Sequence, residues 1–208
     1  RRSNKMGVIT ASVAITLSLF GLAGLTSSAL NRTGHGQKDP APVSYEEDGT
    51  SSVLAASTLE GTIQEISYEQ AYEGVTYEKE ALVYVPASYT PGVPANIVYL
   101  THGWWGSADG LAEGVAPVVD QLTSEGAIAP TLVVFATYYP DRSFATDDYE
   151  EDYALNRFFA TTEIDTLIDT VESRYTTFAR RDTSDQSLRA SRRHRAFGGF
   201  SMGATTTW

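Results

Sequence analysis

Short apolar runs of β-type composition recur along the chain, separated by segments in which apolar residues repeat at helical spacing. The runs occupy residues 61–67, 80–86, 97–100, 131–137 and 197–200. Their short lengths and their content of Val, Ile, Tyr and Phe predict strands rather than helices. Pro86 closes the second run, as expected where a strand ends.

Two segments between these runs have helical periodicity. The first is defined by Val115, Val118, Val119 and Leu122, and the second by Ile164, Leu167, Ile168, Val171 and Tyr175. Thr162 and Asp165 have the spacing of a capping box, which predicts that the second helix begins there. Alternation of strands and helices predicts an α/β fold, with a mostly parallel sheet and helices on both of its faces.

The first 58 residues have a different character. Basic residues at Arg1, Arg2 and Lys5 precede an apolar run from 6 to 25, and small residues follow up to Ala29. This order predicts a cleaved signal peptide over 1–29 and a secreted or extracytoplasmic protein, the alternative being a retained membrane anchor. Residues 30–58 are rich in Gly, Pro, Ser and acids and predict a flexible spacer, so the folded domain is expected over 59–208.

Composition narrows the possible functions. The chain has no Cys, which excludes disulfides, thiolate metal sites and a cysteine nucleophile. Its net charge of −11 becomes −14 once 1–29, with three basic and no acidic residues, are removed. Such acidity argues against nucleic acid or stable membrane association as partners. The arginines between 180 and 195 form one basic cluster, which we interpret as a solvated loop joining a helix to a strand.

The motif Gly-x-Ser-x-Gly occurs at Gly199, Ser201 and Gly203, immediately after the last apolar run. In an α/β-hydrolase this motif is a sharp turn from strand to helix that exposes a nucleophilic serine. Side chains at the two glycine positions would collide with the neighbouring strand and helix. The motif predicts Ser201 as the catalytic nucleophile.

A second motif, His-Gly-x-x-Gly, begins at His102, where the run 97–100 ends. Loops at this place in the fold supply half of the oxyanion hole, and the residue after the nucleophile supplies the other half. We therefore expect the backbone amides of Met202 and Trp104 to bind the oxyanion, with Gly103 as the rival to Trp104.

None of the three histidines is well placed to activate Ser201. His102 stands at the strand end of the second motif, where a side chain holds the loop by hydrogen bonds. His194 precedes the last strand, at the opposite end of the sheet, and His35 lies in the spacer. We therefore expect the catalytic histidine and acid beyond Trp208, and expect residues 1–208 alone to be inactive, as an α/β-hydrolase truncated after its nucleophile turn.

Three aromatic residues follow strands at the edge where α/β proteins bind ligands, namely Trp105, Tyr138 and Tyr139. Their rings are candidates for stacking on a sugar or an aromatic acyl group. Packing in the core or at the rim of the site is the alternative for each of them.

Three segments resemble the esterase-D-like family of α/β-hydrolases, which includes bacterial feruloyl and acetyl-xylan esterases. They are the His-Gly-Trp-Trp-Gly-Ser loop at 102–107, the helix at 163–168 and the run 191–203, which ends in Phe-Ser-Met-Gly. The resemblance extends from 61 to 208. It implies a bacterial serine esterase that needs no metal or cofactor and acts on acetyl or feruloyl esters of plant polysaccharide. An acyltransferase of the same fold and a non-catalytic carbohydrate-binding relative are the alternatives.

Overall fold

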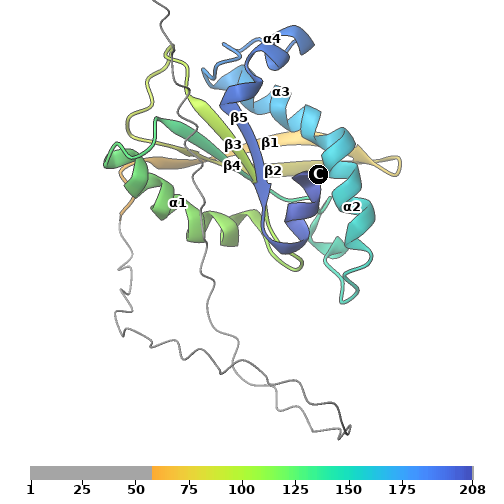
Figure 1. Ribbon diagram of the computed structural model, residues 1–208. Coiled ribbons are helices and arrows are strands. Elements are labelled where there is room, and N and C mark those ends of the chain that lie inside the picture. The colour runs from red at the N-terminus through yellow and green to blue at the C-terminus, as the bar shows by residue number, and fades with distance from the viewer. Residues whose placement is uncertain (1–57, 208) are drawn as a thin grey trace, which may run out of the picture. The chain divides into compact units, whose positions relative to one another are not determined.

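Five strands form one mixed sheet in the computed structural model, which describes residues 58–207. The order across the sheet is β1-β2-β4-β3-β5 (Figure 1). The strands are β1 (Thr62–Tyr72), β2 (Val75–Val85), β3 (Asn96–Thr101), β4 (Thr131–Ala136) and β5 (Arg195–Gly199). The sequence-predicted signal peptide and nearly all of the spacer lie outside the described residues.

The α/β prediction is confirmed, but only the β4, β3 and β5 part of the sheet is parallel. β1 and β2 form a long antiparallel hairpin, and β2 also runs antiparallel to β4. Glu73 and Gly74 make the hairpin turn, both with positive φ, at 49° and 82°. A two-residue turn of this kind matches the twist of paired strands. Both strands are longer than predicted, because polar residues on their exposed faces interrupt the apolar pattern.

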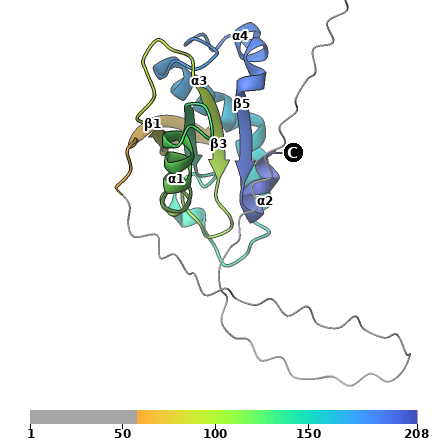
Figure 2. The same cartoon turned by 60° about the vertical axis from the view of Figure 1, so that its left-hand side comes forward.

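Helices cover both faces of the sheet, as predicted (Figures 1 and 2). α1 (Ala108–Ser124) packs on the face that carries Val133 and Phe135 of β4, whereas the alternate residues Leu132 and Val134 face the larger core on the other side. α1 begins at Ser107, whose side chain accepts a hydrogen bond from the Gly110 amide at 3.1 Å. Alanines make up most of its buried residues, so the valine periodicity located the helix but not its most buried face.

The other face is covered by α2 (Asp152–Phe158) and α3 (Ile164–Arg174), which are joined through a π-helical turn, Phe159–Glu163. The predicted capping box is therefore wrong, because Thr162 lies inside this turn rather than at a helix start. Glu163 is drawn into the core, where its Oε1 pairs with Lys79 Nζ at 2.5 Å and accepts a hydrogen bond from the Tyr68 hydroxyl at 2.6 Å. Within residues 58–207 no helix is long and apolar enough to cross a membrane.

A buried ion pair ties the start of β5 to α3. Arg195 Nε and Nη2 donate to the Glu172 carboxylate at 2.5 and 2.8 Å, and Glu172 is fully buried. Tyr99 and Thr177 donate to the same carboxylate, at 3.2 and 2.7 Å. The prediction that the arginine cluster is a solvated loop is wrong for Arg195, and part of the segment forms a short helix, α4 (Asp185–Ala190).

β5 is also less buried than its apolar sequence predicts. Among the described residues it pairs only with β3, so one edge is open. Phe197 is 46% exposed although its ring stacks on Tyr99, with 5.4 Å between the ring centres. Phe200, just after the strand, is 48% exposed.

Removing the Arg195 side chain should destabilise the fold by about 3 kcal/mol, because it leaves the Glu172 charge buried without its partner. Urea unfolding of Arg195→Ala checks this. The matched control is Arg189→Ala, whose ion pair with Asp185 is exposed to solvent and should contribute nothing measurable. Equal midpoints for wild type and Arg195→Ala would contradict the assignment.

Candidate active site

Ser201 is the first residue of the 3₁₀ helix η4 (Ser201–Thr207) and lies at the strained turn that joins this helix to β5. Its φ is +51°, in the left-handed region that residues other than Gly, Asn and Asp seldom adopt. The Gly203 amide closes the turn by donating to the Phe200 carbonyl at 2.9 Å. This is the strand-to-helix geometry that the Gly-x-Ser-x-Gly pattern predicts.

Both glycines of the motif are required by close packing, as the sequence predicts. A Cβ atom on Gly203 would overlap the carbonyl oxygens of Thr101 and His102 at the end of β3. A Cβ atom on Gly199 would overlap the backbone of Gly203 itself. Glycine therefore allows η4 to lie directly against β3, and this contact fixes the position of Ser201.

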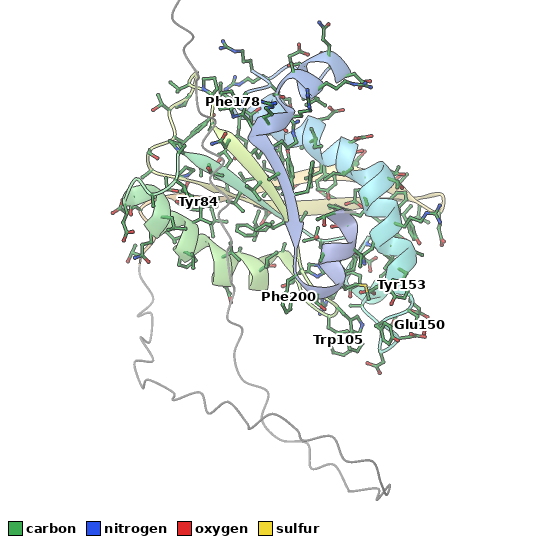
Figure 3. All side chains as sticks on the ribbon, viewed as in Figure 1. Tyr84, Trp105, Glu150, Tyr153, Phe178 and Phe200 are labelled. Carbon is green, nitrogen blue, oxygen red and sulfur yellow. The ribbon has the colours of Figure 1, made fainter. Side chains whose placement is uncertain are left out.

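The two sequence motifs meet at one end of the sheet. β3 and β5 are parallel neighbours with Thr101 opposite Gly199, so the segments that follow both strands leave the sheet side by side. A Cβ atom on Gly103 would lie 3.2 Å from the Cβ of Ser201 and 3.1 Å from the Phe200 ring. Figure 3 shows Phe200 and Trp105 at this same end of the molecule.

The amide of Met202, which follows Ser201, has no acceptor within residues 58–207, and neither has the amide of Trp104 in the loop after β3. The next two amides of the loop are occupied, since Trp105 donates to the Tyr139 hydroxyl at 3.1 Å and Gly106 to the Gly103 carbonyl at 2.9 Å. Free amides are what an oxyanion hole requires. The Gly103 amide is also unpaired within the same residues, so it stays the rival of Trp104.

His102 holds the loop rather than facing the serine. It is 2% exposed, and its Nδ1 lies 2.7 Å from the Gly103 carbonyl oxygen while its Nε2 lies 2.7 Å from Thr137 Oγ1. A carbonyl can only accept, so Nδ1 carries the proton and Nε2 accepts from Thr137. Burial lowers the pKa of the imidazole, which favours this neutral form.

His194 lies at the other end of β5. Its Nδ1 is 2.9 Å from Asn96 Oδ1, and its ring stacks on Phe178, which Figure 3 shows at the end of the molecule opposite Phe200. Neither histidine of residues 58–207 is thus free to take a proton from Ser201. Within the same residues no group of three or more His, Asp or Glu is placed to hold a metal ion.

Tyr138 and Tyr139 do not present their rings to a ligand, and the prediction of substrate contact is corrected for both. They are 0% and 2% exposed, and each hydroxyl donates to Asp152 Oδ2 at 2.8 Å. Both tyrosines are instead packed in the core. Both rings pack against His102, with ring centres 4.7 and 5.3 Å from that of the imidazole, which gives the two tyrosines that follow β4 a structural role.

Trp105 is 51% exposed and belongs to a row of exposed aromatic side chains. Trp104, Tyr149 and Tyr153 continue the row, with edge-to-face contacts between neighbouring rings. Both indole N–H groups donate to one acceptor, the Thr146 carbonyl. Figure 3 places Trp105 and Tyr153 near the same end of the molecule. The sequence signal that was missed is the pair of tyrosines four residues apart in an acidic segment.

Comparison with known proteins finds similar sequences and similar folds. No family model matches the chain. Endo-1,4-beta-xylanase Y of Acetivibrio thermocellus is 32% identical over 192 residues, which is 91% of this chain and 16% of that protein. The feruloyl esterase module from Clostridium thermocellum, solved as a complex with sinapinate, is 30% identical with a TM-score of 0.53, over 71% of this chain and 48% of that one.

A structure described as FAE is also 30% identical, with a TM-score of 0.57 over 74% of this chain and 50% of that one. The chain is therefore similar to feruloyl esterases in both sequence and fold. A ferulic acid esterase from Anaeromyces mucronatus, 21% identical with a TM-score of 0.55 over 70% of this chain and 52% of that one, shares the fold. Taken together, these similarities confirm the resemblance to esterase-D-like α/β-hydrolases. The chain spans about half the length of these solved structures.

Gly203→Ala should lower the free energy of unfolding by about 3 kcal/mol, because the new methyl group overlaps the end of β3. Gly114→Ala is the matched control. Gly114 is exposed on α1 with no atom near its Cβ position, so alanine there should stabilise the helix by about 0.5–1 kcal/mol. Denaturant unfolding measures both, and a neutral Gly203→Ala would contradict the packing argument.

Proposed function

We propose that the protein is a serine esterase that cleaves carboxylic esters through an acyl-enzyme formed on Ser201. The observation that carries this proposal is the contact between the two motifs. Gly103 lies against Ser201, so a hydroxyl on a strained turn stands beside backbone amides that have no other acceptor in the described part of the chain. A nucleophile and oxyanion donors in contact are the minimum that acyl transfer requires.

In the proposed reaction, Ser201 Oγ attacks the ester carbonyl carbon and gives its proton to a general base. The carbonyl oxygen becomes an oxyanion, which the amides of Met202 and Trp104 stabilise. Collapse of the intermediate breaks the bond to the alcohol, which leaves with the proton held by the base. Water then attacks the acyl-enzyme by the same steps in reverse order, releasing the carboxylic acid and restoring the Ser201 hydroxyl.

The general base and its acid are proposed to come from outside residues 58–207. His102 has both ring nitrogens engaged, and His194 lies at the opposite end of the sheet. The feruloyl esterase structures to which the chain is similar are about twice as long as the portion matched. That additional length provides room for a histidine and a carboxylate that complete the site.

The proposed substrate is a feruloyl or acetyl ester of a plant polysaccharide, and the proposed location is outside the cytoplasm. Similarity to a xylanase and to a feruloyl esterase module bound to sinapinate supports the substrate. The exposed ring of Trp105, one residue beyond the proposed oxyanion donor, is suited to stacking on an aromatic acid or a sugar. The acidic net charge suits a neutral polymer better than an anionic one.

Ser201→Ala in the complete protein should lower the turnover of a chromogenic acetyl ester on the order of 10⁶-fold, because the acyl-enzyme cannot form. A fluorophosphonate probe should label wild-type protein at Ser201, as mapped by peptide mass spectrometry. Ser173→Ala, an exposed serine on α3, is the control and should keep full labelling. Label on another residue would refute the nucleophile, and product formed only with an added sugar acceptor would indicate an acyltransferase.

Trp105→Ala should lower kcat/KM for a feruloyl ester about 5- to 10-fold, because one aromatic stacking partner is lost. Trp105→Phe, which keeps a ring face, should recover most of this loss. Hydrolysis of an acetyl ester by the same variants is the internal control, since a small acyl group has no ring to stack. An equal loss on both esters would mean that Trp105 only shapes the loop.

A further inference from the structure

The loop that follows β3 is held in a conformation that it would not adopt without restraint. Trp105 has a φ of +62°, in the left-handed region, and no glycine relieves the strain there. The Gly106 amide returns to the Gly103 carbonyl at 2.9 Å, so residues 103–106 form a tight turn beside Ser201. A strained turn persists only where surrounding groups hold it. The side chains that contact the backbone of Trp105 and Gly106 are therefore the groups that stabilise this turn.

The Tyr139 hydroxyl is the first of these groups. It donates its only proton to Asp152 Oδ2 at 2.8 Å, and Asp152 is fully buried. With the proton committed to the carboxyl group, the hydroxyl oxygen presents its lone pairs to the loop, and the Trp105 amide donates to it at 3.1 Å. Asp152, at the start of α2, therefore orients the Tyr139 hydroxyl, and this hydroxyl in turn holds the loop that follows β3.

The second group that holds the turn is the Arg142 guanidinium. Its Nη1 donates to the Gly106 carbonyl at 2.6 Å and its Nη2 to the Trp105 carbonyl at 2.8 Å. The same guanidinium lies 5.9 Å from the centre of the Tyr139 ring. A planar fork that binds two successive carbonyls fixes both position and direction, which a single ammonium group cannot do.

We infer that Tyr139 and Arg142 are positioning residues that set the geometry of the oxyanion loop. Together they engage the amide and carbonyl of Trp105 and the carbonyl of Gly106, and they leave the Trp104 amide without a competing partner. Neither residue is assigned a contact with the substrate. The inference rests on the proposed function, because it specifies how the Trp104 amide is kept in place for the oxyanion that forms on ester attack.

Tyr138 provides a matched control for Tyr139. Each hydroxyl donates to the same Asp152 oxygen at 2.8 Å, and both side chains are buried, but only Tyr139 also accepts from the loop. In the complete protein, Tyr139→Phe should lower kcat for a chromogenic acetyl ester at least tenfold with KM nearly unchanged, because the oxyanion exists only after attack. Tyr138→Phe should lower kcat less than about twofold, while both variants lose a similar amount of thermal stability.

Arg142→Lys separates geometry from charge. It keeps the positive charge but loses the fork, so kcat should fall several-fold with KM nearly unchanged. Arg157→Lys, an exposed arginine on α2, is the control and should change neither constant. If Arg142→Lys matches the wild type, the fork does not position the loop and this half of the inference is wrong.

Hydrogen–deuterium exchange keeps the test independent of catalysis. Peptides that cover residues 103–106 should exchange faster in Tyr139→Phe than in wild type, and at the wild-type rate in Tyr138→Phe. Equal kcat losses in the two tyrosine variants, or unchanged exchange in Tyr139→Phe, would overturn the inference. A wild-type protein without esterase activity would refute the proposed function instead, and the exchange data would still decide whether Tyr139 restrains the loop.

Discussion

Thr101 fastens the carboxyl ends of β3 and β5 together, and the candidate site depends on this contact. Its carbonyl accepts a hydrogen bond from the Phe200 amide at 3.1 Å, and its side-chain hydroxyl donates to the Gly203 carbonyl at 2.9 Å. The parallel register with Gly199 then brings the turn that carries Ser201 against the loop that follows β3. Without this pairing, Ser201 and the free amides of the loop after β3 would belong to separate surfaces.

Polar contacts also connect the hairpin to the oxyanion loop. Lys79, which is buried in β2, donates to the Thr137 carbonyl at 2.9 Å, and the Thr137 hydroxyl lies 2.7 Å from His102 Nε2. His102 in turn reaches the Gly103 carbonyl. Burying Lys79 is costly unless its charge is paired, and Glu163 provides that pairing. The antiparallel half of the sheet thus supports the oxyanion loop indirectly, through Lys79, Thr137 and His102.

The elements with strong local signals were the ones that the sequence predicted correctly. The Gly-x-Ser-x-Gly motif and the apolar run of β4 are each contained in a few consecutive residues, so pattern alone located them, although the atoms that require glycine at 203 belong to Thr101 and His102. The capping box at Thr162 failed because Lys79, far away in sequence, draws Glu163 into the core and continues the helix. Substrate contact by Tyr139 failed for the same reason, since Asp152 determines where its hydroxyl lies. Long-range polar pairing leaves no periodic signal.

Thr146 serves both tryptophans of the loop with one carbonyl oxygen, which receives the indole N–H of Trp104 at 3.2 Å and that of Trp105 at 2.5 Å. Neither ring can rotate away without giving up this acceptor, although the two side chains are 42% and 51% exposed. These two large side chains therefore lose their rotational entropy when the protein folds. A planar ligand that meets these rings binds side chains that are already ordered, and its affinity is not reduced by ordering them a second time.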